Sequence, residues 1–151
     1  MKHDTSRRHL LMLGAMATAL GGATRAVEAA DWTAVERANA KTVTDFCAGW
    51  AARNIETLLP FFAEKAVYRV TETSQPIVGR DAIRDFSKRF FERMTSVEFK
   101  VSETFAKGPL VLNERIDTFV SPQRTQRYHA VGMFFLVDDK IVEWTDYIMK
   151  D

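Results

Sequence analysis

Cysteine, histidine and glycine are scarce in this chain of 151 residues, and each scarcity excludes a class of site. The single cysteine, Cys47, cannot form a disulfide within the chain, and it falls on the apolar stripe of an expected helix, where burial is the simplest expectation. Of the three histidines only His129 lies beyond the N-terminal segment, so no Cys/His cluster has the spacing of a metal site. The glycines form no phosphate-binding loop. We therefore expect neither a metal nor an organic cofactor.

A long hydrophobic run is also missing. The most apolar stretch lies among the first thirty residues, spans roughly 15 positions and is broken by glycines, whereas a membrane-spanning helix needs about 20. It follows the pair Arg7–Arg8 and ends in small residues at Ala29–Ala30, which is typical of an export signal of the twin-arginine type. We expect residues 1–29 to be a removable signal and the mature protein to be periplasmic or secreted, without a stable membrane anchor. An uncleaved anchor or a disordered tail is the alternative.

Charge of one sign is not in excess. The formal net charge is +1, and removal of the signal takes away four basic and two acidic residues, which leaves about −1. This balance gives no reason to expect nucleic acid or an anionic membrane as a partner. The remaining residues 31–151, about 120 in number, form one domain by size and can bury roughly two-thirds of their unfolded surface.

The remaining chain changes its apolar periodicity from helical to strand-like. Apolar residues recur at helical spacing over residues 31–53 and 79–94, and Asn54 can begin a short helix between them. Residues 66–72 favour a strand, and four later stretches alternate with period two between turn sequences: 97–106, 110–120, 126–137 and 141–148. This order predicts an α+β fold in which a strongly curved sheet wraps the helices, with Gly132 as a candidate bulge.

The last strand places a carboxylate on an apolar face. Asp146 shares its side of the strand with three apolar residues, Val142, Trp144 and Ile148. An aspartate in such a place is costly unless it is hydrogen-bonded or paired with a cation. It is either a structural carboxylate held by backbone amides or an ion pair, or a member of a functional site.

Arg115 is the natural partner for that carboxylate. It lies two residues before Asp117 on a strand, so both side chains point to one face. A guanidinium can hold two carboxylates at once through its forked donors, which predicts an array of Asp117, Arg115 and Asp146 in an apolar cup. The strand does not settle its own orientation. Tyr68 shares a face with Ala66 and is either a pocket residue that binds water or a core tyrosine.

Several segments resemble the limonene-1,2-epoxide hydrolase group of the SnoaL-like, nuclear-transport-factor-2-like superfamily: GRDAIRDF, NERIDTF and VGMFFLVDDKIVEWTDY, together with Tyr68. The likeness covers most of the chain after the signal. Its more specific parts are Arg-x-Asp on one strand and Trp-x-Asp-Tyr on the last. It implies a cone-shaped, cystatin-like α+β barrel in which N-terminal helices pack in a strongly curved mixed sheet.

The resemblance also implies roles for the array in a one-step opening of an epoxide. Asp146 would be the general base on a water, Asp117 the general acid on the epoxide oxygen, and Arg115 the bridge between them. Tyr68 would help to hold the water, and neither a metal nor a covalent intermediate is needed. The family has an asparagine two residues after this tyrosine that aims the water, and Val70 takes its place here.

Three functional hypotheses stay open. The first is hydrolysis of a small hydrophobic epoxide, with a lining drawn from residues such as Phe119, Met133, Phe134 or Phe135. The second is an isomerase or cyclase acting on an enolisable ketone, with Tyr68 or His129 polarising the carbonyl. The third is a non-catalytic periplasmic domain that binds a small molecule. In each, an open curved sheet with an exposed apolar face favours a homodimer, which the resemblance implies as well.

Overall fold

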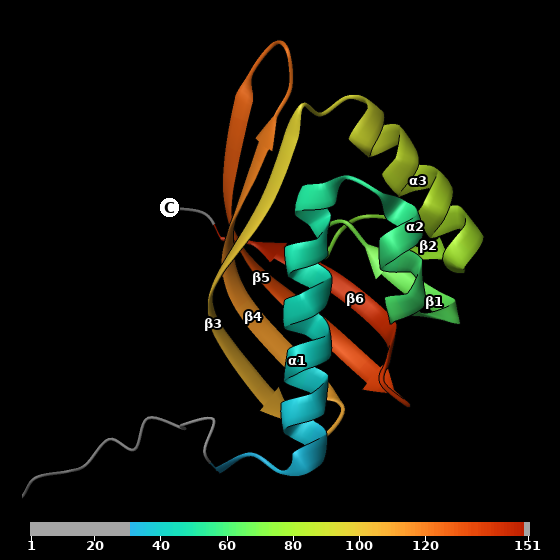
Figure 1. The fold of residues 1–151 in the computed structure, drawn as a ribbon, viewed down its shortest axis with the longest axis vertical. Coiled ribbons are helices and arrows are strands. Elements are labelled where there is room, and N and C mark those ends of the chain that lie inside the picture. Colours follow the sequence, from blue (N-terminus) through green and yellow to red (C-terminus); the bar gives the residue numbers. More distant parts are fainter. Residues whose placement is uncertain (1–30, 150–151) are drawn as a thin grey trace, which may run out of the picture.

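Helices precede most of the strands, in the order that the sequence predicts (Figure 1). The structure is a computed structural model, and it describes residues 31–149. The elements are α1 (Ala34–Gly49), α2 (Ile55–Leu58), β1 (Phe62–Arg69), β2 (Ile77–Val78), α3 (Arg80–Glu92), β3 (Ser96–Lys107), β4 (Leu110–Val120), β5 (Thr125–Val137) and β6 (Lys140–Ile148). The expected signal, residues 1–29, lies outside the described residues. No helix between residues 31 and 149 is long and apolar enough to cross a membrane.

The strands form one mixed sheet in the order β2-β1-β6-β5-β4-β3. β1 runs parallel to β6, and all other neighbours are antiparallel. The sheet curves around α1, while α2 and α3 cover its other end (Figure 1). The expected α+β architecture with helices packed in a curved mixed sheet is confirmed. The sheet stays open at its edges β2 and β3 and does not close into a barrel.

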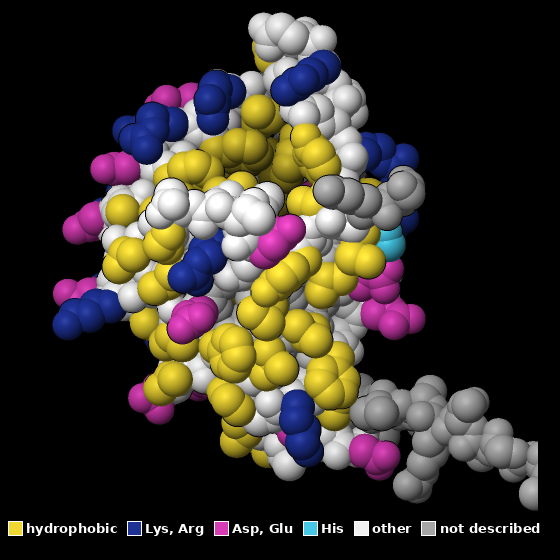
Figure 2. All heavy atoms as spheres, turned by 180° about the vertical axis from the view of Figure 1, so that it is seen from behind, with side chains coloured by type: hydrophobic (Ala, Val, Ile, Leu, Met, Phe, Trp, Pro, Cys, Tyr) yellow, Lys and Arg dark blue, Asp and Glu magenta, His cyan; other side chains and the backbone are white. Residues whose placement is uncertain are grey.

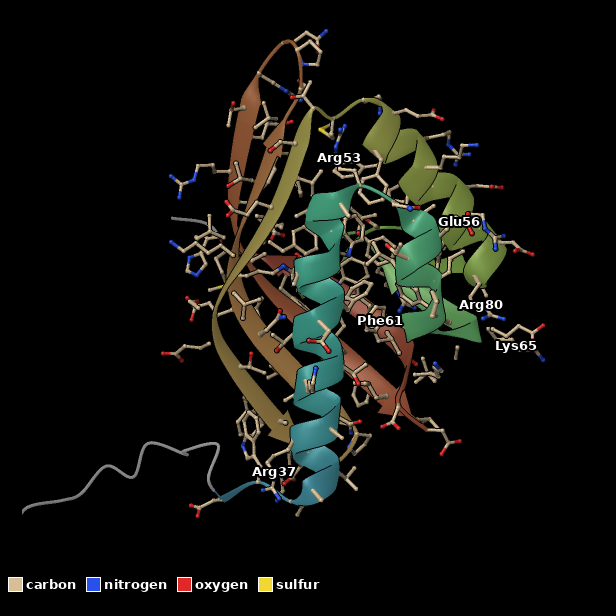
Figure 3. The ribbon with its side chains drawn as sticks, viewed as in Figure 1. Arg37, Arg53, Glu56, Phe61, Lys65 and Arg80 are labelled. Atoms are coloured by element: carbon tan, nitrogen blue, oxygen red, sulfur yellow. The ribbon has the colours of Figure 1, made fainter. Side chains whose placement is uncertain are left out.

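Local signals begin the helices where the sequence indicates. The Thr33 hydroxyl accepts a hydrogen bond from the Glu36 backbone, and the Glu36 carboxylate accepts one from the Thr33 backbone, which makes a capping box for α1. Asn54 caps α2 through its side chain. Glu56 on α2 faces α3 (Figure 3), where it accepts a hydrogen bond from Arg84 at 3.1 Å. The first two helices therefore start at residues whose side chains satisfy free backbone N–H groups, whereas α3 begins after Gly79 without a side-chain cap.

Aromatic side chains fill the space between α1 and the sheet. Phe46 on α1 meets Trp144 on β6 edge to face, with ring centres 5.1 Å apart, and both residues are fully buried. Trp50, at the end of the same helix, stacks on Phe99 of β3 at 4.9 Å. Such contacts add about 0.5–1.5 kcal/mol each to the burial of the rings. They hold the helix layer at a fixed height above the strands that carry Arg115, Asp117 and Asp146.

Two details of the sheet differ from the sequence prediction. The first strand covers residues 62–69 instead of 66–72, because the chain turns after Arg69 with a hydrogen bond from Ser74 N to Thr71 O at 3.0 Å. Gly132 is not a bulge, since it pairs regularly with Asn113 on one side and Asp146 on the other. The register shifts of the sheet lie elsewhere, in the segments 62–67, 101–103 and 135–136.

Candidate active site

Two strands bring the three ionisable residues of the expected array together. Arg115 and Asp117 lie on β4, and Asp146 lies on β6, with β5 between them. All three face the helices, and their exposed fractions are 0%, 3% and 5%. The sequence left the orientation of β4 open, and in the structure Arg115 and Asp117 point inward.

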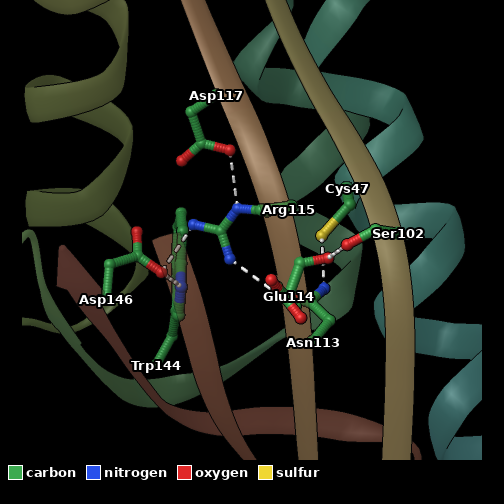
Figure 4. Close-up of polar contacts among 8 residues, drawn as sticks. All are labelled: Cys47, Ser102, Asn113, Glu114, Arg115, Asp117, Trp144 and Asp146. Atoms are coloured by element: carbon green, nitrogen blue, oxygen red, sulfur yellow. Dashed lines mark hydrogen bonds and ion pairs between the residues drawn. The ribbon is translucent and has the colours of Figure 1, made fainter. Parts of the chain in front are cut away.

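Arg115 contacts both carboxylates, as Figure 4 shows. Its Nε donates to Asp117 Oδ1 at 2.8 Å, and its Nη2 donates to Asp146 Oδ1 at 2.6 Å. The guanidinium carbon also lies 4.7 Å from the centre of the Phe99 ring, a cation–π contact. Charge-assisted hydrogen bonds from a forked donor fix both the distance and the orientation of the two acids. The geometric array that the sequence predicts is present.

Trp144 determines which oxygen of Asp146 is available. Its indole Nε1 donates to Asp146 Oδ1 at 2.6 Å, the same oxygen that Arg115 holds. Both donors thus contact one oxygen, and Oδ2 is left for a ligand. Tyr68 stacks on Trp144 with ring centres 4.0 Å apart and is itself buried, so it lies beside the carboxylate. The inward orientation expected for Tyr68 is confirmed.

Burial dominates the electrostatics of the array. It raises the pKa of Asp146 to about 6, against the opposing pull of Arg115, and it raises the pKa of Asp117 as well. Burial alone would lower the pKa of Arg115, but the two carboxylates outweigh it and keep the guanidinium charged. Burial also raises the pKa of Tyr68, so its hydroxyl keeps its proton. Asp146 therefore changes its protonation near neutral pH, and burial shifts the pKa of Asp117 in the same direction.

The two acids open onto a cavity of about 320 Å³. Its walls are mainly aromatic, with a few polar groups: Trp50, Tyr68, Val70, Thr71, Phe86, Phe90, Phe99, Asp117, Phe119, Gln126, Tyr128, Asp146 and Ile148. Such a volume suits a small, largely apolar ligand. Because β1 ends at Arg69, the next two residues, Val70 and Thr71, both lie in this wall.

Of the four candidate lining residues, Phe119 is the one that lies in the cavity wall. Phe119 faces the cavity, whereas Phe134 is fully buried beneath it in the core. Met133 and Phe135 alternate with Phe134 and therefore point to the outer face of the sheet. His129 shares that outer parity and contacts Glu114 at 2.5 Å, so it is not part of the cavity. The carbonyl-polarising role considered for His129 is excluded by this position.

Two residues that support the array were missed in the sequence. Asn113 accepts a hydrogen bond from Arg115 Nη1 at 2.9 Å through Oδ1, and its amide nitrogen donates to Cys47 Sγ at 3.2 Å. A Cβ placed on Gly132 would lie 2.1 Å from Arg115 Nη1 and 2.7 Å from Asn113 Oδ1. The glycine thus leaves the space that the guanidinium occupies. A glycine within a strand can mark such a close approach, which was the available signal.

Cys47 and the remaining acidic residues offer nothing to a metal. Burial raises the pKa of the Cys47 thiol to about 12, so it stays protonated beside Asn113. Between residues 31 and 149 there is no group of three His, Cys, Asp or Glu side chains that could hold a metal ion. The two carboxyls that line the cavity, Asp146 and Asp117, can exchange protons with a ligand.

The comparisons with known proteins agree with this fold. The model of the SnoaL-like domain family matches residues 43–144, and the chain belongs to this family. No curated protein matches its sequence significantly. Many solved structures match its fold.

Three of these solved structures illustrate the range of the fold. An LEH-like epoxide hydrolase of M. tuberculosis has a TM-score of 0.69 and 22% identity, over 76% of this chain and 84% of that one. A protein of Shewanella putrefaciens assigned to the SnoaL-like polyketide cyclases has a TM-score of 0.67 and 16% identity, over 73% and 88%. A cystatin-fold protein of Novosphingobium aromaticivorans has a TM-score of 0.64 and 15% identity, over 72% and 96%. These likenesses establish the fold.

Replacing Gly132 with alanine tests whether the glycine makes room for Arg115. The added methyl group would displace the guanidinium and leave buried carboxylates without their cation, which costs about 3–5 kcal/mol when a buried pair is broken. We expect G132A to lower the free energy of unfolding in urea by an amount of that order. G108A is the control, because a Cβ at Gly108 meets nothing within 4 Å and its φ of +56° gives only a backbone cost of about 1 kcal/mol. Equal losses in the two variants would contradict the steric role.

Proposed function

We propose that this protein is a hydrolase that adds water to a small hydrophobic epoxide in one step. The observation that carries the proposal is the guanidinium of Arg115 held between Asp117 and Asp146 at the wall of an aromatic cavity. Family membership and the likeness to an LEH-like epoxide hydrolase are consistent with it. Both acids lie in the wall of one cavity, so a ligand bound there can meet an acid and a base at once.

The reaction uses the two acids in opposite roles. Asp146 Oδ2 takes a proton from a water molecule as the water oxygen attacks a ring carbon. The carbon–oxygen bond of the epoxide breaks, and Asp117 gives its proton to the leaving oxygen, so the product is a vicinal diol. Asp146 ends protonated and Asp117 ionised, and exchange with solvent restores both. Each proton transfer can contribute about 10²–10⁴ in rate.

The single positive charge of Arg115 gives a reason for the two acids to differ in protonation. One cation between two buried carboxylates compensates one negative charge, so the second carboxylate is stabilised by keeping a proton. Asp146 receives donors from both Arg115 and Trp144, whereas Asp117 receives one from Arg115. The additional donor offsets part of the burial that raises the pKa of Asp146, so that this carboxyl still ionises near neutral pH. A bound apolar substrate removes water from Asp117 and favours its protonated form further.

A specific observation favours a second candidate, an isomerase or cyclase acting on an enolisable ketone. Val70 lies in the cavity wall and offers no hydrogen bond to a water. Without that partner, Asp146 could instead take a proton from carbon while Tyr68 donates to the carbonyl oxygen of the substrate. The cyclase-assigned neighbour shows that the fold is compatible with this class. A non-catalytic binding domain is the third reading, and it requires no turnover at all.

Isotope labelling separates these candidates. Purified protein should convert cyclic or aryl epoxides in H₂¹⁸O to diols with one labelled oxygen, and kcat/KM should fall about tenfold per pH unit below about pH 6, as Asp146 becomes protonated. D146N should lose about 10²–10⁴ in kcat because the base is gone. K88N, on the exposed side of α3, is the matched control and should retain full activity. Ketone isomerisation without any diol, lost in Y68F, would instead establish the second candidate.

Restoring a water ligand tests the role of Val70. V70N places an amide in the cavity wall where the relatives' motif has an asparagine, so it should raise kcat for epoxide hydrolysis with little change in KM. An increase of about tenfold corresponds to one better-aimed hydrogen bond of about 1.4 kcal/mol. V70T, which adds a hydroxyl without the reach of an amide, is the comparison. A fall in kcat for both variants would show that the apolar wall itself is required.

We further propose that two copies pair through the outer face of the sheet. Exposed or half-buried apolar side chains gather there, including Phe105, Met133, Phe135 and Tyr147, and Figure 2 shows the apolar area on this side of the molecule. Acidic and basic residues occur on the same face, among them Glu143 and Lys100, so two copies related by a two-fold axis can place opposite charges together. A second copy would therefore cover this face.

Sedimentation tests this pairing. The mature protein should sediment as a dimer of the domain at micromolar concentration, and M133E should shift it to a monomer because a carboxylate would be buried at the contact. K65E, on the exposed part of β1, is a control for the added negative charge. A monomeric parent protein, or an M133E variant that stays dimeric and folded, would contradict the proposal.

A further inference from the structure

The mouth of the cavity adjoins a second, more open hollow. This hollow has a volume of about 680 Å³ and shares two wall residues with the cavity, Phe90 and Gln126. It lies between the C-terminal end of α3 and the hairpin that joins β4 to β5. The two elements rise side by side at the top of the molecule in Figure 1, and Figure 2 shows a recess lined with apolar side chains beneath the hairpin. A ligand that fills the cavity can therefore extend directly into the hollow.

Polar and basic side chains stand among apolar ones in the walls of this hollow, which also include Phe90, Met94 and Pro122. The walls contain Arg93 and Arg124, one acidic residue, Glu92, and four uncharged polar residues: Thr95, Ser121, Gln123 and Gln126. Within residues 31–149 neither arginine side chain forms an ion pair. Both are exposed, so their guanidinium groups are free to bind an anion. The local charge of +1 matches a single negative charge on a ligand.

Backbone contacts hold these residues in place. The Ser121 hydroxyl bonds the backbone of Arg124 at 3.2 Å and closes the hairpin turn. Thr95 N donates to Val120 O at 2.7 Å, which ties the end of α3 to the hairpin. Arg53, shown at the end of α1 in Figure 3, donates to the Met94 carbonyl and fixes the same connection from below. Arg93 at the end of α3 and Arg124 in the hairpin therefore belong to segments that hydrogen bonds tie together.

We propose that the natural ligand is an amphipathic monocarboxylate. Its apolar head, which bears the reactive group, fills the aromatic cavity, and its carboxylate tail passes Phe90 and Gln126 to bind Arg93 and Arg124. Forked guanidinium donors suit a carboxylate, and Gln123 and Gln126 add neutral donors along the path. The substrate class rests on the proposed function, because an epoxide or ketone in the head would meet Asp117 and Asp146.

Binding of non-reactive probes tests this tail site without turnover. Phenylacetate, 4-phenylbutyrate and 6-phenylhexanoate are compared with their carboxamides by calorimetry and by the fluorescence of Trp50, which lies in the cavity wall. We expect one of the longer acids to bind about fivefold to tenfold tighter than its amide, since two exposed charge contacts give an effect of this size. Phenylacetate should show no such preference, because its carboxylate cannot leave the cavity. Salt at 0.5 M should reduce the preference.

Variants that each remove one positive charge test which residues cause the preference for the acid over the amide. R93Q and R124Q should each reduce the preference for the acid several-fold, and the double variant should abolish it. K88Q removes the same charge from another face of α3, away from both hollows, and should leave it unchanged. Equal binding of acid and amide, or an acid preference that survives R93Q/R124Q, would overturn the tail site. This test measures binding and does not depend on turnover. A failure to form diols would overturn the proposed hydrolysis without affecting the test of the tail site.

Discussion

The burial of one guanidinium governs the architecture of this site. Arg115 has no exposed surface, and an unpaired cation in such a place would cost several kcal/mol. The protein compensates with two carboxylates, an amide oxygen and the face of an aromatic ring, each from a different sequence position. Three strands have to keep their register for these groups to meet. A register shift of one residue in β4 would turn Arg115 to the outer face of the sheet and break its contact with Asp146.

The same constraint explains how much of the site was readable from the sequence. The alternation of β6 placed Asp146 among apolar neighbours, and the cost of an unpaired carboxylate then pointed to Arg115 and Asp117. That inference needed only the period of a strand and the energetics of burial. The order of helices and strands followed equally from periodicity, and the bounds of β4 agreed at both ends. Alternation between a buried and an exposed face involves only neighbouring positions of the chain, so it can be recognised from the sequence alone.

What could not be read depends on contacts across the sheet. The order of the last four strands followed from the short turns between them, but the close approach of Gly132 to Arg115 depends on the register of β5 against β4, which period and composition do not reveal. Asn113 shares the parity of Arg115, but its bond to Cys47 needs the position of α1. The end of β1 was misplaced because the side chains of Val70 and Thr71 suit a strand, whereas a hydrogen-bonded turn at residues 71–74 decides the backbone. Each of these misses concerns tertiary packing that overrides local preference.

The energetics of the array set it apart from an ordinary stabilising ion pair. A buried arginine with two carboxylates contributes little net stability, and well-packed apolar residues in its place are often neutral or stabilising. Because the pKa of Asp146 is raised to about 6, its folded-state benefit is present at low pH and is lost as the pH rises towards that value. At neutral pH the ionised carboxylate therefore works against folding. Stability alone does not account for such a group in the wall of a ligand cavity, a position typical of functional sites.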